Sequence, residues 1–218
     1  MDTFLFDFDG VLVDSMTMWA DTIIKLLNEN NVKYPENLIE IITPLGNGKT
    51  ADYLVSIGLN MTPNEILKHI GDVAVKEYTF NIPAKPGVEN ALKILKEKGF
   101  CLNVLTASSH PVVDMCLKRL KLYDYFDNVW SCDDFGMPKT NPEVYKSAAK
   151  RLGKKCENCI VFDDNLGAVT TAKKAGMKVV GVYDETSKQY EEQMRETADF
   201  YVYSLEEATD VLKGVINY

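Results

Sequence analysis

The chain has 218 residues, of which 46% are hydrophobic and 26% are charged, a composition typical of globular proteins and unlike that of disordered ones. Asp and Glu outnumber Lys and Arg by 32 to 24, and the net charge of −8 argues against a general nucleic-acid or anionic-membrane surface. No apolar run reaches the roughly 18 residues of a membrane span. Asp2, Asp7 and Asp9 stand where a signal peptide would be apolar. We therefore expect a cytoplasmic protein without membrane or nucleic-acid partners.

The first part of the chain predicts one strand followed by a block of helices. Residues 3–8 form an apolar run typical of a strand. Residues 15–82 contain no convincing strand, and Asn, Gly and Pro turns divide them into helical stretches. Such a block between a first strand and the rest of an α/β domain is typical of a cap or lid. We expect a cap of residues 15–82 and a core of residues 1–14 and 83–218. The helical stretches are 16–27, 35–42, 49–57 and 63–78.

Beyond residue 87 helical and strand-like segments alternate. Helices separated by short apolar strands favour an α/β fold with a mainly parallel sheet covered on both faces. The strands are expected at 100–105, 129–131, 159–162, 178–182 and 200–203, and the helices at 87–98, 111–122, 142–152, 166–175, 187–197 and 205–215.

The five cysteines are scattered, and their odd number speaks against a disulfide scaffold. Cys156 and Cys159 form a lone CxxC without a second pair. Metal or redox use is one interpretation of this pair, and a turn leading into a strand is the interpretation that we prefer.

Carboxylates follow two of the predicted strands. Asp7 and Asp9 end the first strand, and Gly10 lets the chain turn sharply. Asp163 and Asp164 follow the strand 159–162. In a parallel sheet, ligands bind beyond the carboxyl ends of the strands, so side-by-side strands would place four carboxylates in one crevice. Their mutual repulsion requires a cation, and oxygen ligands favour Mg²⁺.

Two other strand ends supply groups that suit a phosphoryl anion. Thr106, Ala107 and the serines that follow offer a hydroxyl and successive backbone N–H groups just before a helix. The alternative is that Thr106 or Ser109 merely caps that helix. Lys139 lies between two prolines ahead of another helix, whereas most lysines are solvated surface charges. Together with the carboxylates and a divalent ion, these groups would make a balanced phosphoryl site.

These motifs occur along the chain in the same order as in a known protein family. The run Asp7–Ser15 (DFDGVLVDS), followed by Thr106, Lys139 and the Asp163–Asp164 pair, resembles the haloacid dehalogenase superfamily. Within it, the chain is similar to the beta-phosphoglucomutase-like group, which has a helical cap after the first strand. The resemblance implies a three-layer α/β/α Rossmann-like core with a mainly parallel sheet and an inserted all-helical cap.

The resemblance also implies roles for the site residues. Asp7 would be the nucleophile that forms an aspartyl-phosphate, and Asp9 the general acid and then base, with its backbone carbonyl on Mg²⁺. Asp7 and Asp164 would be metal ligands, and Asp163 would bind through water or orient Lys139. The family more often has Glu at position 163.

The remaining roles concern the phosphoryl group and the type of reaction. Thr106 and the Ala107 amide would bind phosphoryl oxygens, and Lys139 would neutralise charge. Asp9 is absent from dehalogenases and phosphonatases of the superfamily, so its presence indicates hydrolysis or transfer of phosphate esters. We expect an Mg²⁺-dependent phosphatase, as a monomer, acting on a small phosphorylated metabolite.

A sugar phosphomutase is the alternative, and a non-catalytic phospho-ligand-binding protein is a minor one. Mutases of the group tend to carry a cap histidine and a cap arginine, where this chain has Trp19 and Lys49. Trp19 would stack on substrate or belong to the cap core. Lys49 would reach the site from a glycine-flanked loop, but as a point charge it suits a second phosphate less well than arginine does. The balance favours the phosphatase.

Overall fold

The computed structural model describes residues 2–42 and 45–207. They fall into two compact units, each with its own buried hydrophobic cluster. The first unit, which we call the core unit, comprises the chain up to Ser15 together with the chain from Ile82 on. The second, the helical unit, is Met16–Asn81.

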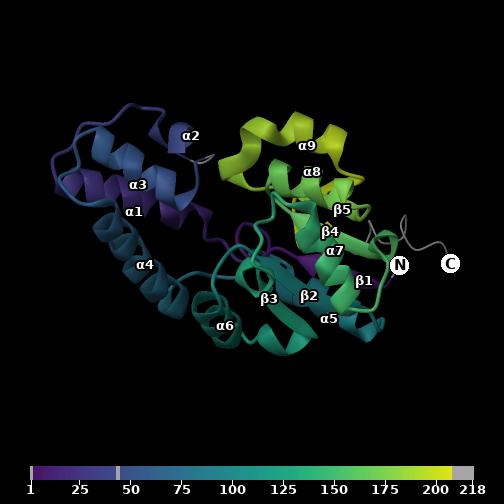
Figure 1. Cartoon of the computed structure of the whole chain (residues 1–218). Helices are drawn as coiled ribbons and strands as arrows, with labels where there is room; N and C mark the ends of the chain where they lie inside the picture. Colours follow the sequence, from purple (N-terminus) through teal and green to yellow (C-terminus); the bar gives the residue numbers. More distant parts are fainter. Residues whose placement is uncertain (1, 43–44, 208–218) are drawn as a thin grey trace. The chain divides into compact units, whose positions relative to one another are not determined.

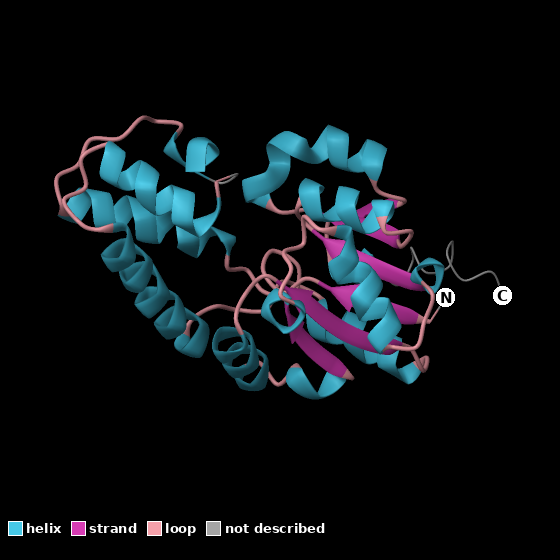
Figure 2. Cartoon of the chain, viewed as in Figure 1, coloured by secondary structure: helices cyan, strands magenta, loops and turns pink. Residues whose placement is uncertain are grey.

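The described strands of the core unit form one sheet in the order β3-β2-β1-β4-β5-β6, and every neighbouring pair is parallel (Figure 2). The chain builds β2 and β3 on one side of β1 and then β4, β5 and β6 on the other. Ligands of such sheets bind beyond the carboxyl ends of the strands at the point where the order reverses. The strands are β1 (Thr3–Phe6), β2 (Cys101–Thr106), β3 (Asn128–Ser131), β4 (Cys159–Asp163), β5 (Lys178–Val182) and β6 (Phe200–Val202).

Helices cover both faces of this sheet. On one face Leu5, Val161 and Val179 pack in a buried cluster with Tyr145 and Val169, which belong to α7 and α8 (Figure 1). Right-handed crossovers to β2 and β3 place α5 and α6 on the opposite face, because the strand order reverses at β1. The helices are α5 (Val88–Glu97), α6 (His110–Arg119), α7 (Pro142–Arg151), α8 (Leu166–Lys174) and α9 (Glu191–Thr197).

Aromatic rings line that opposite face. Side chains alternate along a strand, so Phe4 and Phe6 flank Leu5 on the other side. The ring of Phe6 stacks on that of Phe162 with centroids 4.8 Å apart. The three-layer α/β/α fold with an inserted helical unit is therefore confirmed.

The helical unit contains no strand among its described residues. Its core is formed mainly by Ile23, Leu27, Leu54, Ile66 and Ile70. A capping box, in which Thr62 and Glu65 bind each other's backbone N–H groups, starts its longest helix. The helices are α1 (Met16–Glu29), α2 (Leu38–Ile42), α3 (Gly46–Ser56) and α4 (Pro63–Phe80).

Some predicted boundaries were wrong. The strand expected at 3–8 ends at Phe6, because the chain turns at Gly10, where φ is +72°. The helix expected at 35–42 begins only at Leu38, after a turn in which the Leu38 N–H donates to the Pro35 carbonyl. The helix expected at 187–197 is a 3-10 helix, Glu185–Tyr190, followed by α9. Of the helix expected at 205–215, residues 208–215 lie outside the described residues.

The CxxC pair lies where the chain enters β4. Cys156 begins a short 3-10 helix, Cys156–Asn158, and Cys159 is the first residue of β4. Both thiols are free, and burial raises the pKa of Cys159 to about 12, which disfavours the reactive thiolate. None of the described helices combines the length and the apolar character needed to cross a bilayer.

Candidate active site

Three carboxylates meet at the ends of two adjacent strands. β1 pairs with β4, and the Asp7 N–H extends this pairing by donating to the Phe162 carbonyl at 2.8 Å. Asp7 therefore leaves β1 beside the end of β4, where Asp163 and Asp164 lie. One carboxylate oxygen from each of these three aspartates lies within 4.8 Å of the others. The structure thus brings Asp7 and Asp164 together at the switch point of the sheet.

Lys139 bridges two of these carboxylates. Its Nζ lies 2.7 Å from Asp7 Oδ1 and 2.8 Å from Asp163 Oδ2, and its side chain is only 11% exposed. Burial by itself lowers the pKa of this lysine, but the two carboxylates raise it well above its usual value. The two carboxylates therefore favour the protonated, cationic form of Lys139.

Asp164 forms no ion pair with Lys139 of the kind that Asp7 and Asp163 form. The residue is only 4% exposed, and its carboxylate lies beside those of Asp7 and Asp163. Burial, and then the charges of Asp163 and Asp7, raise its pKa well above the usual value. A nearly buried carboxylate beside two others is unfavourable as an anion unless a cation lies close to it.

The donor set fits a divalent cation. The three carboxylates and Lys139 leave a formal charge of minus two, and all the converging donors are oxygens. Oxygen donors are the ligands that Mg²⁺ prefers, usually together with several waters and a phosphate.

The fourth carboxylate predicted for this crevice, that of Asp9, does not belong to the group whose oxygens lie within 4.8 Å of one another. The Asp9 side chain accepts hydrogen bonds from the hydroxyl of Ser15, on Oδ1, and of Ser108, on Oδ2, each at 2.5 Å. β1 ends at Phe6, so the alternation of side chains along a strand does not extend to Asp7 and Asp9. Two hydroxyl donors suit the ionised form of Asp9, which can accept a proton.

The expected phosphate-binding segment follows β2. Thr106 is the last residue of that strand and is buried, and its hydroxyl oxygen accepts the N–H of Ser108 at 3.1 Å. Ala107 is exposed at the turn. Ser109 stands at the N-cap of α6, but its side chain makes no capping hydrogen bond. The interpretation of Ser109 or Thr106 as a side-chain cap of this helix was therefore wrong.

The two cap candidates lie in the helical unit. The ring of Trp19 is partly buried against the hydrophobic cluster of that unit, with its centroid 6.4 Å from that of Tyr78. Lys49 is exposed on α3. Trp19 thus contributes to the core of its own unit, and contact of either residue with a substrate stays a prediction.

Four residues near the site had not been singled out from the sequence. Ser15 and Ser108 bind Asp9, and Lys85 and Asp184 form a nearly buried ion pair. Ser108 lies in the segment already expected to bind phosphate. For Lys85, the only local signal is its place between Pro83 and Pro86.

The comparison with family models decides the family. The model described as haloacid dehalogenase-like hydrolase matches residues 4–182, which include both strand-end acidic motifs, Thr106 and Lys139. The chain belongs to the haloacid dehalogenase-like hydrolase family. The resemblance inferred from the motifs is therefore confirmed.

Relatives of this haloacid dehalogenase-like chain cover four fifths or more of its length. YhcW of Bacillus subtilis, which bears the provisional name of a phosphatase, is 30% identical over 81% of the chain and 80% of its own length. A phosphorylated carbohydrates phosphatase of Thermotoga maritima is 25% identical over 99% of the chain and 100% of its own length. A solved structure from Thermotoga maritima, provisionally described as a beta-phosphoglucomutase, superposes with a TM-score of 0.80 at 25% identity, covering 99% of this chain and 100% of that one.

Proposed function

We propose that this haloacid dehalogenase-like phosphatase hydrolyses phosphate monoesters of small metabolites, with Mg²⁺ as cofactor and Asp7 as the nucleophile. The observation that carries the proposal is the meeting of the Asp7, Asp163 and Asp164 carboxylates, two of which, those of Asp7 and Asp163, pair with Lys139. Phosphoryl transfer needs a nucleophile, a cation for the developing charge and a group that handles the proton. The core unit has a candidate for each.

Asp7 and Asp164 would hold Mg²⁺ directly, and Asp163 would bind through water while orienting Lys139. The backbone carbonyl of Asp9 is the further ligand that the family resemblance implies. When bound, the ion offsets the repulsion between the Asp7 carboxylate and a phosphate dianion.

In the first half of the reaction, Asp7 attacks phosphorus and the bond to the leaving oxygen breaks. The result is an aspartyl-phosphate on Asp7, and the leaving alkoxide takes a proton from Asp9 and departs as the alcohol. Lys139, the Thr106 hydroxyl and the Ala107 amide bind the phosphoryl oxygens. Lys139 is suited to this task because it also contacts Asp7 and so sets the position of the nucleophile.

In the second half, Asp9 is ionised and accepts a proton from water, whose oxygen attacks phosphorus. The bond between phosphorus and Asp7 breaks, inorganic phosphate leaves, and both aspartates return to their starting states. The hydroxyls of Ser15 and Ser108 favour the proton-accepting form of Asp9 in this half.

A phosphate-release screen tests the proposal. We would assay sugar phosphates, nucleotides and small phospho-acids with Mg²⁺ and with EDTA. We expect activity with Mg²⁺ alone, loss of activity in Asp7→Asn, and slowed turnover or a trapped phosphoenzyme in Asp9→Asn. Turnover at the same rate in EDTA, or full activity of Asp7→Asn, would contradict the proposal. Binding of a phosphorylated ligand without turnover would instead favour the binding-protein alternative.

The sugar phosphomutase remains the second candidate, and the Thermotoga structure with that provisional description is the observation that favours it. One assay separates the two. With a hexose 1-phosphate and a bisphosphorylated activator, a phosphatase releases inorganic phosphate faster than the 6-phosphate forms, and a mutase does the reverse.

A further inference from the structure

Lys85 has the contacts of a built-in structural cation. Its Nζ donates to the Gly10 carbonyl at 2.8 Å, the Tyr183 carbonyl at 2.9 Å and Asp184 Oδ2 at 3.0 Å. An ammonium group has three donors, so each has an acceptor. The side chain is 17% exposed, far less than that of a typical surface lysine.

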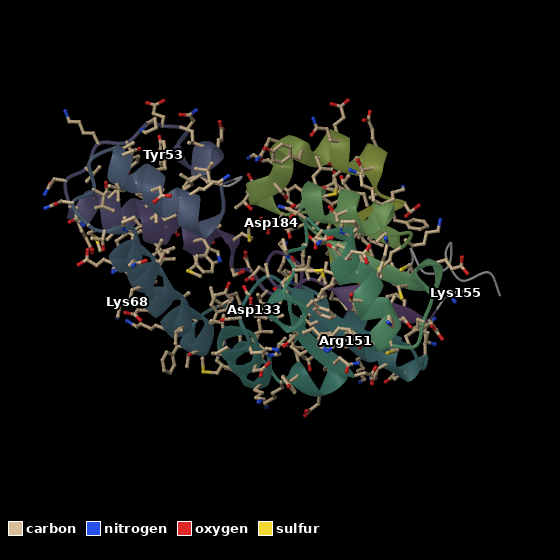
Figure 3. The ribbon with its side chains drawn as sticks, viewed as in Figure 1. Tyr53, Lys68, Asp133, Arg151, Lys155 and Asp184 are labelled. Carbon is tan, nitrogen blue, oxygen red and sulfur yellow. The ribbon has the colours of Figure 1, made fainter. Side chains whose placement is uncertain are left out.

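Its partner Asp184 is fixed in the fold. The Asp184 side chain is 5% exposed, and its other oxygen, Oδ1, accepts the N–H of Thr186 at 3.0 Å and the Thr186 hydroxyl at 2.7 Å. Asp184 lies two residues after β5, at the edge of the sheet where the strands end (Figure 3). Because both of its oxygens are bound, Asp184 holds Lys85 in one place.

The group that Lys85 holds is the loop that carries the acidic motif. The Gly10 N–H donates to the Val13 carbonyl, and the Gly10 carbonyl accepts from Lys85. The backbone N–H of Lys85 also donates to the Leu12 carbonyl at 3.0 Å. Gly10 in turn lies directly against Asp164, since a Cβ at this glycine would stand 2.6 Å from the Asp164 carboxylate.

We infer that Lys85, anchored by Asp184, is a positioning residue that holds the Gly10 loop against Asp164 and thereby keeps the carboxylates in the arrangement that binds a divalent cation. The inference rests on the proposed function and adds two residues to it. Residues that orient metal ligands from behind affect metal affinity by about 10–100-fold when they are replaced. Lys85 acts through the backbone of the Gly10 loop, whereas Lys139 contacts the Asp7 carboxylate itself.

Charge alone would give a different result. Asp184 lies close enough to Asp164 for its charge to help raise the pKa of Asp164, after burial and the nearer carboxylates. If Lys85 acted only by charge, Lys85→Met would make the site more negative and bind Mg²⁺ more tightly, and Asp184→Asn would do the opposite. If it acts by position, both variants bind Mg²⁺ more weakly.

The experiment is a calorimetric titration of the full chain with Mg²⁺ alone. We expect both Lys85→Met and Asp184→Asn to weaken Mg²⁺ binding about tenfold. The double variant removes both charges and therefore leaves no unpaired buried ion. We expect its folded state to be more stable than that of either single variant. We expect the double variant also to bind Mg²⁺ about tenfold more weakly than the wild type. If only charge mattered, the double variant would bind Mg²⁺ with wild-type affinity. Thermal denaturation without Mg²⁺ checks that each variant is folded.

Steady-state kinetics provide the second measurement. Lys96→Met is the matched control, because Lys96 forms a 2.7 Å ion pair with Asp127 away from the acidic site. The Mg²⁺ concentration for half-maximal phosphate release should rise about tenfold in the double variant, with kcat largely recovered at saturating Mg²⁺. General destabilisation of the fold would not raise the Mg²⁺ requirement while leaving kcat at saturating Mg²⁺ largely unchanged. Unchanged or tighter Mg²⁺ binding in Lys85→Met, or full recovery in the double variant, overturns the inference alone. Failure of the wild-type chain to bind Mg²⁺ overturns the proposed function as well.

Discussion

The α-carbon of Gly10 packs directly against the carboxylate of Asp164. A Cβ at position 10 would stand 2.6 Å from Asp164 Cγ and Oδ2, closer than such atoms approach in proteins. Gly10 also has a φ of +72°, in the left-handed region where a side chain is strained. The close approach and the backbone conformation both require glycine here.

Gly10→Ala should therefore abolish most of the activity. We expect phosphate release to fall more than about 100-fold, because the new methyl group must displace Asp164, and stability to fall by roughly 1–2 kcal/mol from backbone strain. Phosphate-release kinetics and urea denaturation measure the two effects. Gly153→Ala is the matched control, since Gly153 has a φ of +66° but open space around it. Equal activity in the two variants would show that the contact with Asp164 does not matter.

Lys139→Met should destabilise the protein in a manner that depends on Mg²⁺. Removing this cation leaves the buried Asp163 and the partly buried Asp7 without their ion-pair partner, which costs about 3–5 kcal/mol of unfolding free energy in EDTA. Because the site then carries a larger negative charge, Mg²⁺ should recover more stability in the variant than in the wild type. Urea denaturation with and without Mg²⁺ measures this, and Lys154→Met, which loses only a surface pair with Asp2, serves as the control. A variant as stable as the wild type in EDTA would contradict the expectation.

His110 should stabilise the protein only at low pH. Its Nε2 lies 2.8 Å from Asp134 Oδ2 and its Nδ1 lies 3.5 Å from Asp114 Oδ1, and the bond with Asp134 raises its pKa. A raised folded pKa means that the stabilisation is complete below the unfolded value of about 6.5 and is lost as the pH rises through the folded value. We expect His110→Gln to be less stable than the wild type near pH 5.5 and equal to it near pH 9, by urea denaturation. The same loss at both pH values would rule out the charge as its cause, and His69→Gln controls for the other histidine.

The two units should be separable, which tests the proposed division into a core domain and a helical cap. The two crossing segments run side by side in the core unit, where Val13 bridges Ala84 and the Asp14 N–H donates to the Pro83 carbonyl at 3.0 Å. A short Gly-Ser linker can therefore replace residues 16–81. We expect the shortened chain to fold cooperatively and to bind Mg²⁺, with weaker discrimination among phosphate esters. An aggregated or unfolded product would show that the core unit depends on the insertion.

Local signals in the sequence predicted the sheet and most of the site. Each of the two apolar strands that lead into aspartates is visible in a short stretch of sequence, and the strand order of the sheet then brings Asp7 beside Asp163 and Asp164. Lys139 was recognised because it lies between two prolines in a rigid loop ahead of α7.

Contacts between segments that are far apart in the sequence were not predicted. The partners of Lys85 lie at Gly10, Tyr183 and Asp184, and no pattern around residue 85 points to them. The two serines on Asp9 likewise come from separate segments. The late start of α9 has a local cause that the helical periodicity did not show, since the Asp184 side chain accepts the Thr186 N–H and starts a 3-10 helix first.

β1, which precedes the other described strands in the sequence, occupies an interior position of the sheet. β1 needs β2 on one edge and β4 on the other, and β4 ends at Asp163, far along the chain. Until β2 and then β4 have emerged from the ribosome, backbone groups on both edges and then on one edge of this apolar strand are unpaired, a state that invites aggregation. Asp7 likewise gains its acidic neighbours, Asp163 and Asp164, only when the end of β4 has been synthesised.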